Sequence, residues 1–102
     1  MPTVLEAMAI LERELNFARS SGVKVIRIIH GYGSSGIGGQ IRLASRKFLN
    51  HKMNEGKIRR IIPGEDYTKS NGVYEELIDK YPFLKQKEKT DIKNPGITLI
   101  EL

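Results

Sequence analysis

The chain contains no cysteine, which excludes disulfides, thiolate catalysis and zinc sites built on thiolates. It also lacks long apolar runs. The longest, around residues 26–29 and 97–100, are far too short to span a bilayer. Glu6 and Glu12 interrupt the apolar positions near the N-terminus, a pattern that signal peptides do not show. We therefore expect a cytoplasmic protein with no membrane partner.

Acidic residues are outnumbered by basic ones. The 102 residues include 17 lysines and arginines against 12 aspartates and glutamates, which gives a net charge of +5. This excess favours a polyanionic partner such as nucleic acid, because phosphates attract a basic surface. The alternative is a basic protein whose lysines only keep it dissolved. The length is that of one domain, and the sequence shows no internal repeat.

Apolar residues recur with helical and strand spacing, and the two kinds of segment alternate along the chain. A Thr-x-x-Glu capping box marks the first helix start, and glycines mark the helix ends. Because the connections are short, the first two strands are predicted to run parallel, joined by a right-handed crossover. In chain order we expect a helix from residue 3 to about 21, an internal strand covered on both faces at 23–29, a helix from about 39 to 53 and a strand at 57–62.

The last third of the chain is less regular. Residues 73–80 are predicted to form a short helix that ends before Pro82. Residues 85–93 are polar and rich in lysine, which indicates a mobile connection. A turn at residues 94–96 precedes a closing strand at 97–102. With three recognisable strands in this α/β fold, one edge of the first strand is expected to be open.

A glycine-rich loop follows the first strand. Glycine lets a ligand approach the main chain closely, and amides at a helix start favour anions. The loop matches G-x-G-x-x-G, but a dinucleotide site lacks its acidic residue here, and a P-loop lacks its Lys-Ser or Lys-Thr. The loop therefore either binds phosphates or only forms a wide turn. The candidate phosphate-binding residues are Gly31, Tyr32, Gly33, Ser34, Ser35, Gly36, Gly38, Gly39, Arg42 and Arg46.

His30 is the candidate catalytic residue, because it ends the first strand where open α/β sheets place their ligands. It can exchange a proton near neutral pH; the alternative is that its ring only bonds to the loop backbone. Arg42 and Arg46 lie one helical turn apart and can grip phosphates. Glu65 and Asp66 follow the second strand, so they are expected on the rim of the sheet beside His30. The alternative for this acidic pair is a solvated turn.

The sequence His30-Gly31-Tyr32-Gly33, its Ser-Gly-rich continuation and Ile41-Arg42 resemble the Smr (small MutS-related) domain. Residues 95–102 resemble the closing Gly-x-Thr strand of that family. The resemblance implies a two-layer α/β sandwich over a mixed sheet, similar to the C-terminal domain of a bacterial translation initiation factor. It also implies binding of DNA or RNA and, in several members, nicking or endonucleolytic cleavage.

Carried over residue by residue, the His-Gly-x-Gly motif corresponds to His30, Gly31 and Gly33, and the basic helix-start position corresponds to Arg42. The family normally opens with a strand bearing a Leu-Asp-Leu-His-type motif. We expect a single Smr-like domain over residues 1–102 that lacks this strand. The hypothesis is nucleic-acid binding with possible nicking, with proton transfer by His30 and no required cofactor, although Glu65 or Asp66 is compatible with a divalent metal. The alternatives are a non-catalytic nucleic-acid or ribonucleoprotein interaction module, or a binder of small phosphates or nucleotides.

Overall fold

The computed structural model describes residues 3–31 and 36–102, and the predicted α/β class is confirmed. Thr3 caps the first helix as predicted, because its hydroxyl accepts a hydrogen bond from the Glu6 amide at 3.1 Å. The second helix begins before the predicted residue 39, and the second strand is shorter than predicted. In chain order the α-helices and strands are α1 (Val4–Ser20), β1 (Val25–Ile29), α2 (Gly36–Asn54), β2 (Arg60–Pro63), α3 (Val73–Lys80), α4 (Glu88–Asp91) and β3 (Ile97–Glu101).

The three strands form one sheet in the order β1-β3-β2, with β3 antiparallel to both neighbours. As predicted, β1 and β2 point in the same direction, but they do not pair. The predicted mixed sheet is therefore wrong, because β3 separates the two parallel strands. All five residues of β3 are buried, whereas β1 lies at the edge and ends at the exposed Ile29. The prediction of an internal strand at residues 23–29 is thus also wrong.

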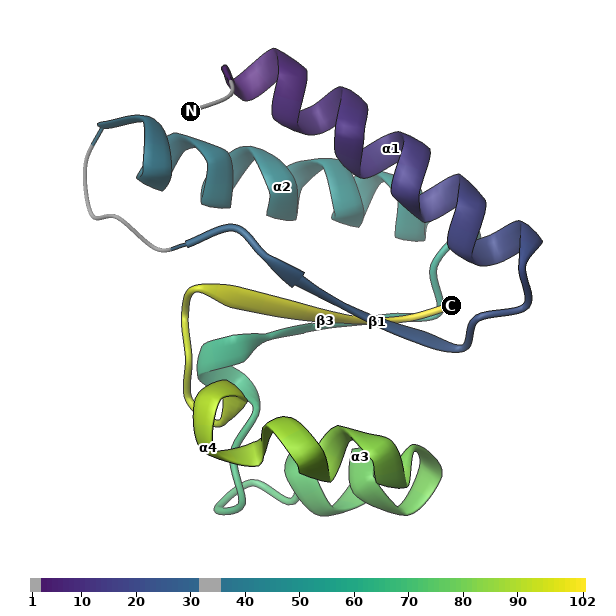
Figure 1. Cartoon of the computed structure of the whole chain (residues 1–102), viewed down its shortest axis with the longest axis vertical. Coiled ribbons are helices and arrows are strands. Elements are labelled where there is room, and N and C mark those ends of the chain that lie inside the picture. The colour runs from purple at the N-terminus through teal and green to yellow at the C-terminus, as the bar shows by residue number, and fades with distance from the viewer. Residues whose placement is uncertain (1–2, 32–35) are drawn as a thin grey trace.

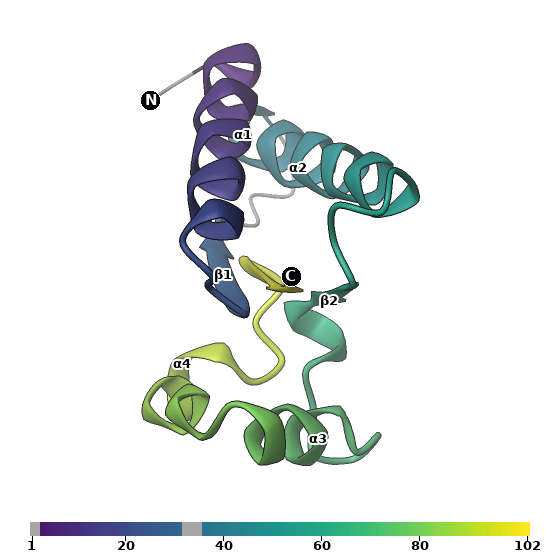
Figure 2. The same cartoon turned by 90° about the vertical axis from the view of Figure 1, so that its right-hand side faces the viewer.

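Helices cover both faces of the sheet. Figure 1 shows α1 and α2 on one side and α3 and α4 on the other, and Figure 2 confirms this arrangement. The molecule therefore has three layers instead of the predicted two, because the buried central strand needs cover on both faces. Each face carries its own apolar cluster. On the side of α1 and α2 it is built from Leu11, Leu15, Leu49, Ile58 and Ile100, and on the side of α3 from Val25, Ile62, Tyr67, Tyr74, Leu77, Leu84 and Leu99.

The C-terminal third is more ordered than the sequence indicated. The helix at Val73–Lys80 is confirmed, but the predicted mobile connection at 85–93 is wrong. This segment continues a 3₁₀ helix (Pro82–Lys87) into α4, and Asp91 is only 1% exposed. Both carboxylate oxygens of Asp91 accept hydrogen bonds from the Arg27 guanidinium, at 2.6 and 2.7 Å. This ion pair ties α4 to β1 across 64 positions of sequence.

The turn before β3 packs against a short 3₁₀ helix (Gly64–Asp66) that follows β2. Gly64 makes this close approach possible, since a Cβ there would lie 1.7 Å from the Asn94 carbonyl oxygen and 2.8 Å from Cγ1 of Ile97. The contact brings the residue after Gly64 beside the residues that lead into β3. The ends of β1 and β2 and the start of β3 thus meet at one rim of the sheet.

Candidate nucleic-acid interface

The first part of this rim is the end of β1. The backbone amides of His30 and Gly31 both donate to the Gly96 carbonyl oxygen, each at 3.0 Å. Gly31 has a φ of +74°, a conformation that side chains rarely adopt, so this glycine is needed for the turn out of the strand. Its amide is engaged by the protein itself. Gly31 therefore shapes the site and does not offer a free donor.

The His30 ring is held from both sides. Its Nδ1 bonds to the Gly31 carbonyl oxygen, and its Nε2 lies 2.9 Å from the Thr98 hydroxyl. A carbonyl oxygen can only accept, so Nδ1 carries the hydrogen and Nε2 accepts from Thr98. The bond to the loop backbone was one of the two roles considered for His30. Sequence reasoning missed the partner Thr98, which is fully buried, although it lies in the Gly-x-Thr segment that supported the family resemblance.

Arg46 joins helix α2 to the end of β2. Its guanidinium donates to both carboxylate oxygens of Glu65, at 2.6 and 2.7 Å, and to the Pro95 carbonyl oxygen at 3.4 Å. Glu65 lies close enough to the end of β1 for its charge to act on the pKa of His30, and its predicted role as an acidic partner stays a prediction. Asp66 is exposed, and in the described part of the chain its side chain takes no part in this group.

Arg42 lies one turn before Arg46 on the same side of α2. The Nε atoms of both arginines are buried and have no hydrogen-bond acceptor among the described residues. Unpaired buried donors are costly, about 1–3 kcal/mol each, and a ligand oxygen would relieve that cost only after the arginine side chain turns its Nε toward the solvent. His30, Arg42, Arg46 and Glu65 are called the strand-end site below. It holds two guanidinium charges against one carboxylate.

The charges of the site act on its titratable groups. Burial lowers the pKa of His30; the hydrogen bond to the Gly31 carbonyl opposes this shift, and the positive charges of Arg46 and Arg42 add to it. The hydrogen bonds from Arg46 hold the pKa of Glu65 below its usual range. At neutral pH the imidazole is therefore uncharged and the carboxylate is charged.

The lowered pKa of His30 predicts a loss of stability in mild acid. As pH falls below about 6.5, the unfolded chain takes up a proton on this histidine before the folded chain does, so the free energy of unfolding decreases. Above this pH the contribution of His30 is constant. Urea denaturation between about pH 7.5 and pH 5.5 measures the effect. His30→Gln should lose this part of the pH dependence, and His51→Gln, at an exposed histidine, should keep it; equal profiles for wild type and His30→Gln would contradict the assignment.

The glycine-rich loop is only partly described. Tyr32, Gly33, Ser34 and Ser35 lie outside the described residues, so their predicted roles stay predictions. The other predicted glycines, Gly36, Gly38 and Gly39, form the first turn of α2 instead of a loop. The first amides of a helix have no partner within it and carry partial positive charge. The start of α2 thus adds to the positive potential on this side of the molecule.

Among residues 3–31 and 36–102, histidine, aspartate and glutamate side chains form no group of three that could hold a metal ion. The same residues include no helix with the length and apolar character needed to cross a membrane.

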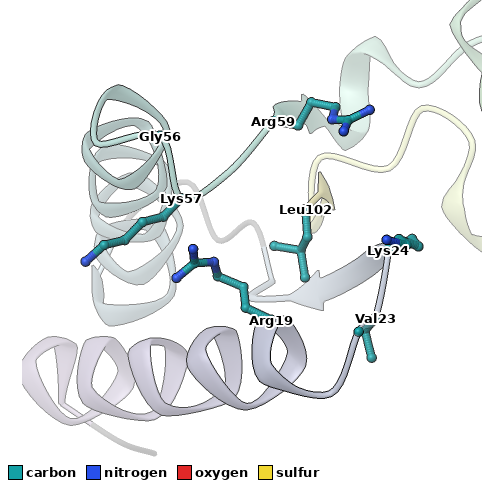
Figure 3. Close-up of a pocket in the computed structure, with 8 residues that line it drawn as sticks. Arg19, Val23, Lys24, Gly56, Lys57, Arg59 and Leu102 are labelled. Carbon is teal, nitrogen blue, oxygen red and sulfur yellow. The ribbon is translucent and has the colours of Figure 1, made fainter.

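A second basic region lies at the opposite end of the sheet (Figure 3), around a cavity of about 480 Å³. Arg19 and Lys57 extend into the gap between the ends of α1 and α2, whereas Arg59 points away from it. Both helices end here, and their last carbonyl groups carry partial negative charge. The cations offset these helix ends, so this cavity is less suited to a phosphate than the strand-end site.

The fold and the site define a small basic α/β domain with a histidine and two arginines at one rim of its sheet. The family model of the Smr domain matches residues 1–74, and the chain belongs to this family, which is associated with nucleic-acid binding and nicking. The family predicted from the sequence is thus confirmed. The match includes the four residues of the strand-end site and ends before β3. No curated protein and no solved structure matches the chain, and the likeness to a translation initiation factor domain stays a prediction.

Proposed function

We propose that this protein binds the phosphate groups of DNA or RNA at the strand-end site. The observation that supports the proposal is the placement of Arg42 and Arg46 on one side of α2. The positive charges of both lower the pKa of His30 at the end of β1, and Glu65 supplies the opposite charge. A guanidinium group presents parallel donors that match two oxygens of a phosphate, which makes arginine well suited to backbone contacts. Such contacts give affinity without sequence preference.

Binding is tested by fluorescence anisotropy with labelled RNA and DNA oligonucleotides over a range of salt concentrations. Two phosphate contacts release condensed counterions, so log K should fall against log salt with a slope of about −1.4 for a single strand and about −1.8 for a duplex. Comparing the two oligonucleotides decides between DNA and RNA. Binding of a mononucleotide that does not weaken with salt would instead support a binder of small phosphates.

Glu65 competes with the ligand for Arg46. Because its carboxylate occupies both guanidinium nitrogens in the free protein, Glu65→Gln should free Arg46 and remove a repelling charge. We expect affinity for oligonucleotides to rise about threefold to tenfold, while the salt slope stays nearly unchanged because Arg46 makes one phosphate contact in both proteins. Glu76→Gln is the matched control, since Glu76 also pairs with an arginine, at 2.7 Å, and is similarly exposed, 47% against 43%. An equal gain in both variants would contradict a specific role for Glu65.

Cleavage of the bound strand is the second candidate function, favoured by a neutral imidazole beside two arginines. In a hydrolysis step, the oxygen of a water molecule would bond to phosphorus as the P–O bond to one strand end breaks. Nε2 of His30 would accept the water's proton and return it to the leaving oxygen, while Arg42 and Arg46 stabilise the charge on the phosphoryl oxygens. Nε2 would have to exchange the Thr98 hydroxyl for that water. A divalent cation at Glu65 would have to displace the Arg46 guanidinium.

The cleavage assay uses a supercoiled plasmid and a structured RNA, with wild type and His30→Ala, each with magnesium and with a chelator. Nicking by wild type that is lost in His30→Ala would support catalysis at this site. If wild type binds both substrates and leaves them intact, the protein is a binding module. Comparing cleavage with magnesium and cleavage with the chelator tests whether the reaction needs a divalent metal.

A further inference from the structure

Within residues 3–31 and 36–102, no strand pairs with the outer edge of β1. Among the described residues β1 pairs only with β3, through bonds that include the Lys24 carbonyl to the Leu102 amide and the His30 amide to the Gly96 carbonyl. Bonding groups alternate along an antiparallel strand, so the N–H and C=O groups of Val25, Arg27 and Ile29 point away from the sheet. Such an edge is a template for another strand.

An apolar groove of about 590 Å³ runs along this edge. One stripe of α1 packs on the sheet through Leu11 and Leu15. A second row on the same helix, which includes Ile10 and Phe17, lines the groove instead. Phe17 is 68% exposed, and Ile29 at the end of β1 is 69% exposed. Figure 2 shows α1 directly above β1 at the border of the sheet, and α2 lies on the side of α1 that faces the middle of the sheet. The open strand edge and the uncovered side of α1 thus form one continuous surface.

We propose that this surface binds a second copy of the chain, with β1 pairing antiparallel to β1 of the partner about a two-fold axis at Arg27. The strand sequence Val25-Ile26-Arg27-Ile28-Ile29 is symmetric about Arg27, with two apolar residues on each side. In this register Val25 faces Ile29 of the other copy and Ile26 faces Ile28, so the flanking pairs are apolar. Moving the centre to Ile26 would place Val25 opposite Arg27, and moving it to Ile28 would place His30 opposite Ile26.

The arrangement also satisfies charge and hydrogen bonding. Two Arg27 side chains face each other at the axis, where like charges would repel, but Asp91 neutralises each one within its own chain. The three outward-facing residues of each strand supply about six hydrogen bonds across the seam. A two-fold axis perpendicular to the sheet keeps both α1 helices on one face, so that their rows with Phe17 meet over the seam. The result is a continuous six-stranded sheet.

Sedimentation equilibrium of the wild-type chain across the micromolar range tests the proposal. A concentration-dependent dimer is expected, shifted to monomer in Phe17→Glu and in Ile29→Lys. Phe83→Glu is the matched control, because Phe83 is 57% exposed and lies on the side of the sheet away from α1, and it should leave the dimer intact. A wild type that stays monomeric, or a Phe83→Glu variant that dissociates as Phe17→Glu does, would overturn the proposal.

The register is tested by disulfide cross-linking. Because the chain has no native cysteine, only the introduced cysteines can form a disulfide. Directly opposite residues have Cα atoms about 5.5 Å apart, within the range of a disulfide. Val25→Cys/Ile29→Cys should form a covalent dimer under mild oxidation, because the two cysteines of one strand are about 13 Å apart and cannot join each other. Val23→Cys/Ile29→Cys would be joined only with Ile26 at the centre. A dimer of the second variant and not of the first would overturn the proposed register.

Discussion

Replacing Arg42 and Arg46 together with glutamine should weaken oligonucleotide binding about a hundredfold at moderate salt. Each guanidinium is expected to make a charged hydrogen bond to a phosphate, and such bonds contribute about 1.5 kcal/mol or more each, roughly tenfold in affinity. The salt slope should flatten by about 1.4 to 1.8, since two phosphate contacts are lost. Fluorescence anisotropy at several salt concentrations measures both effects.

The control for this variant is Lys57→Gln/Arg59→Gln, which removes the same charge from the opposite end of the sheet near the cavity in Figure 3. If binding depends on the strand-end site, the control variant should lose only the small part of the affinity that is due to the net charge of the protein. Equal losses in the two double variants would show that the protein binds nucleic acid by overall charge. The melting temperature of each variant should be measured too, because Arg46→Gln also removes the Glu65 ion pair.

Asp91→Ala is expected to lower the free energy of unfolding by about 3 kcal/mol. The carboxylate is buried and accepts two hydrogen bonds from the Arg27 guanidinium. Removing one partner of a buried ion pair leaves the other charge without a partner, which typically lowers the free energy of unfolding by about 3–5 kcal/mol. Arg27 is 25% exposed, so water recovers part of this cost and the lower end of the range applies. Because small domains are stable by only about 5–15 kcal/mol, the loss is large.

Urea denaturation at a fixed protein concentration measures this change. The double variant Arg27→Met/Asp91→Leu should recover most of the stability, since apolar side chains of similar size can replace a buried pair. A decrease below about 0.5 kcal/mol in Asp91→Ala would be typical of a surface position, and it would contradict the role of this pair in holding α4 on β1.

The helices and strands could largely be predicted from local sequence, but their arrangement could not. The capping box at Thr3 and the helix at Val73–Lys80 are local features, and both are confirmed. The place of β3 depends on pairing between distant parts of the chain, so local sequence could not show that β3 lies between β1 and β2, and the mixed sheet implied by the family resemblance is wrong. Residues 85–93 were misjudged for a similar reason: Asp91 looks solvated among lysines, and its partner Arg27 is far away in sequence.

The strand-end site was predictable where topology alone decided it. Residues that follow two strands of the same direction share a rim, and this rule correctly brought Glu65 toward His30. The rule could not show that Glu65 would bind Arg46, nor that Thr98 would hold the imidazole. The first contact depends on how α2 packs near the end of β2, and the second depends on the place of β3, and neither was known from the sequence. The roles of Tyr32, Gly33, Ser34 and Ser35 remain predictions.

The central claim is that phosphates bind at Arg42 and Arg46, and the most direct measurement follows arginine Nε–H signals by NMR. During titration with a short oligonucleotide, we expect large chemical-shift changes in the Nε–H signals of Arg42 and Arg46 and in the His30 amide signal. These changes should give the same dissociation constant as fluorescence anisotropy. The signals of Arg19 and Arg59, at the other end of the sheet, should barely move. Large shifts at Arg19 and Arg59 with unchanged signals from Arg42 and Arg46 would contradict the account.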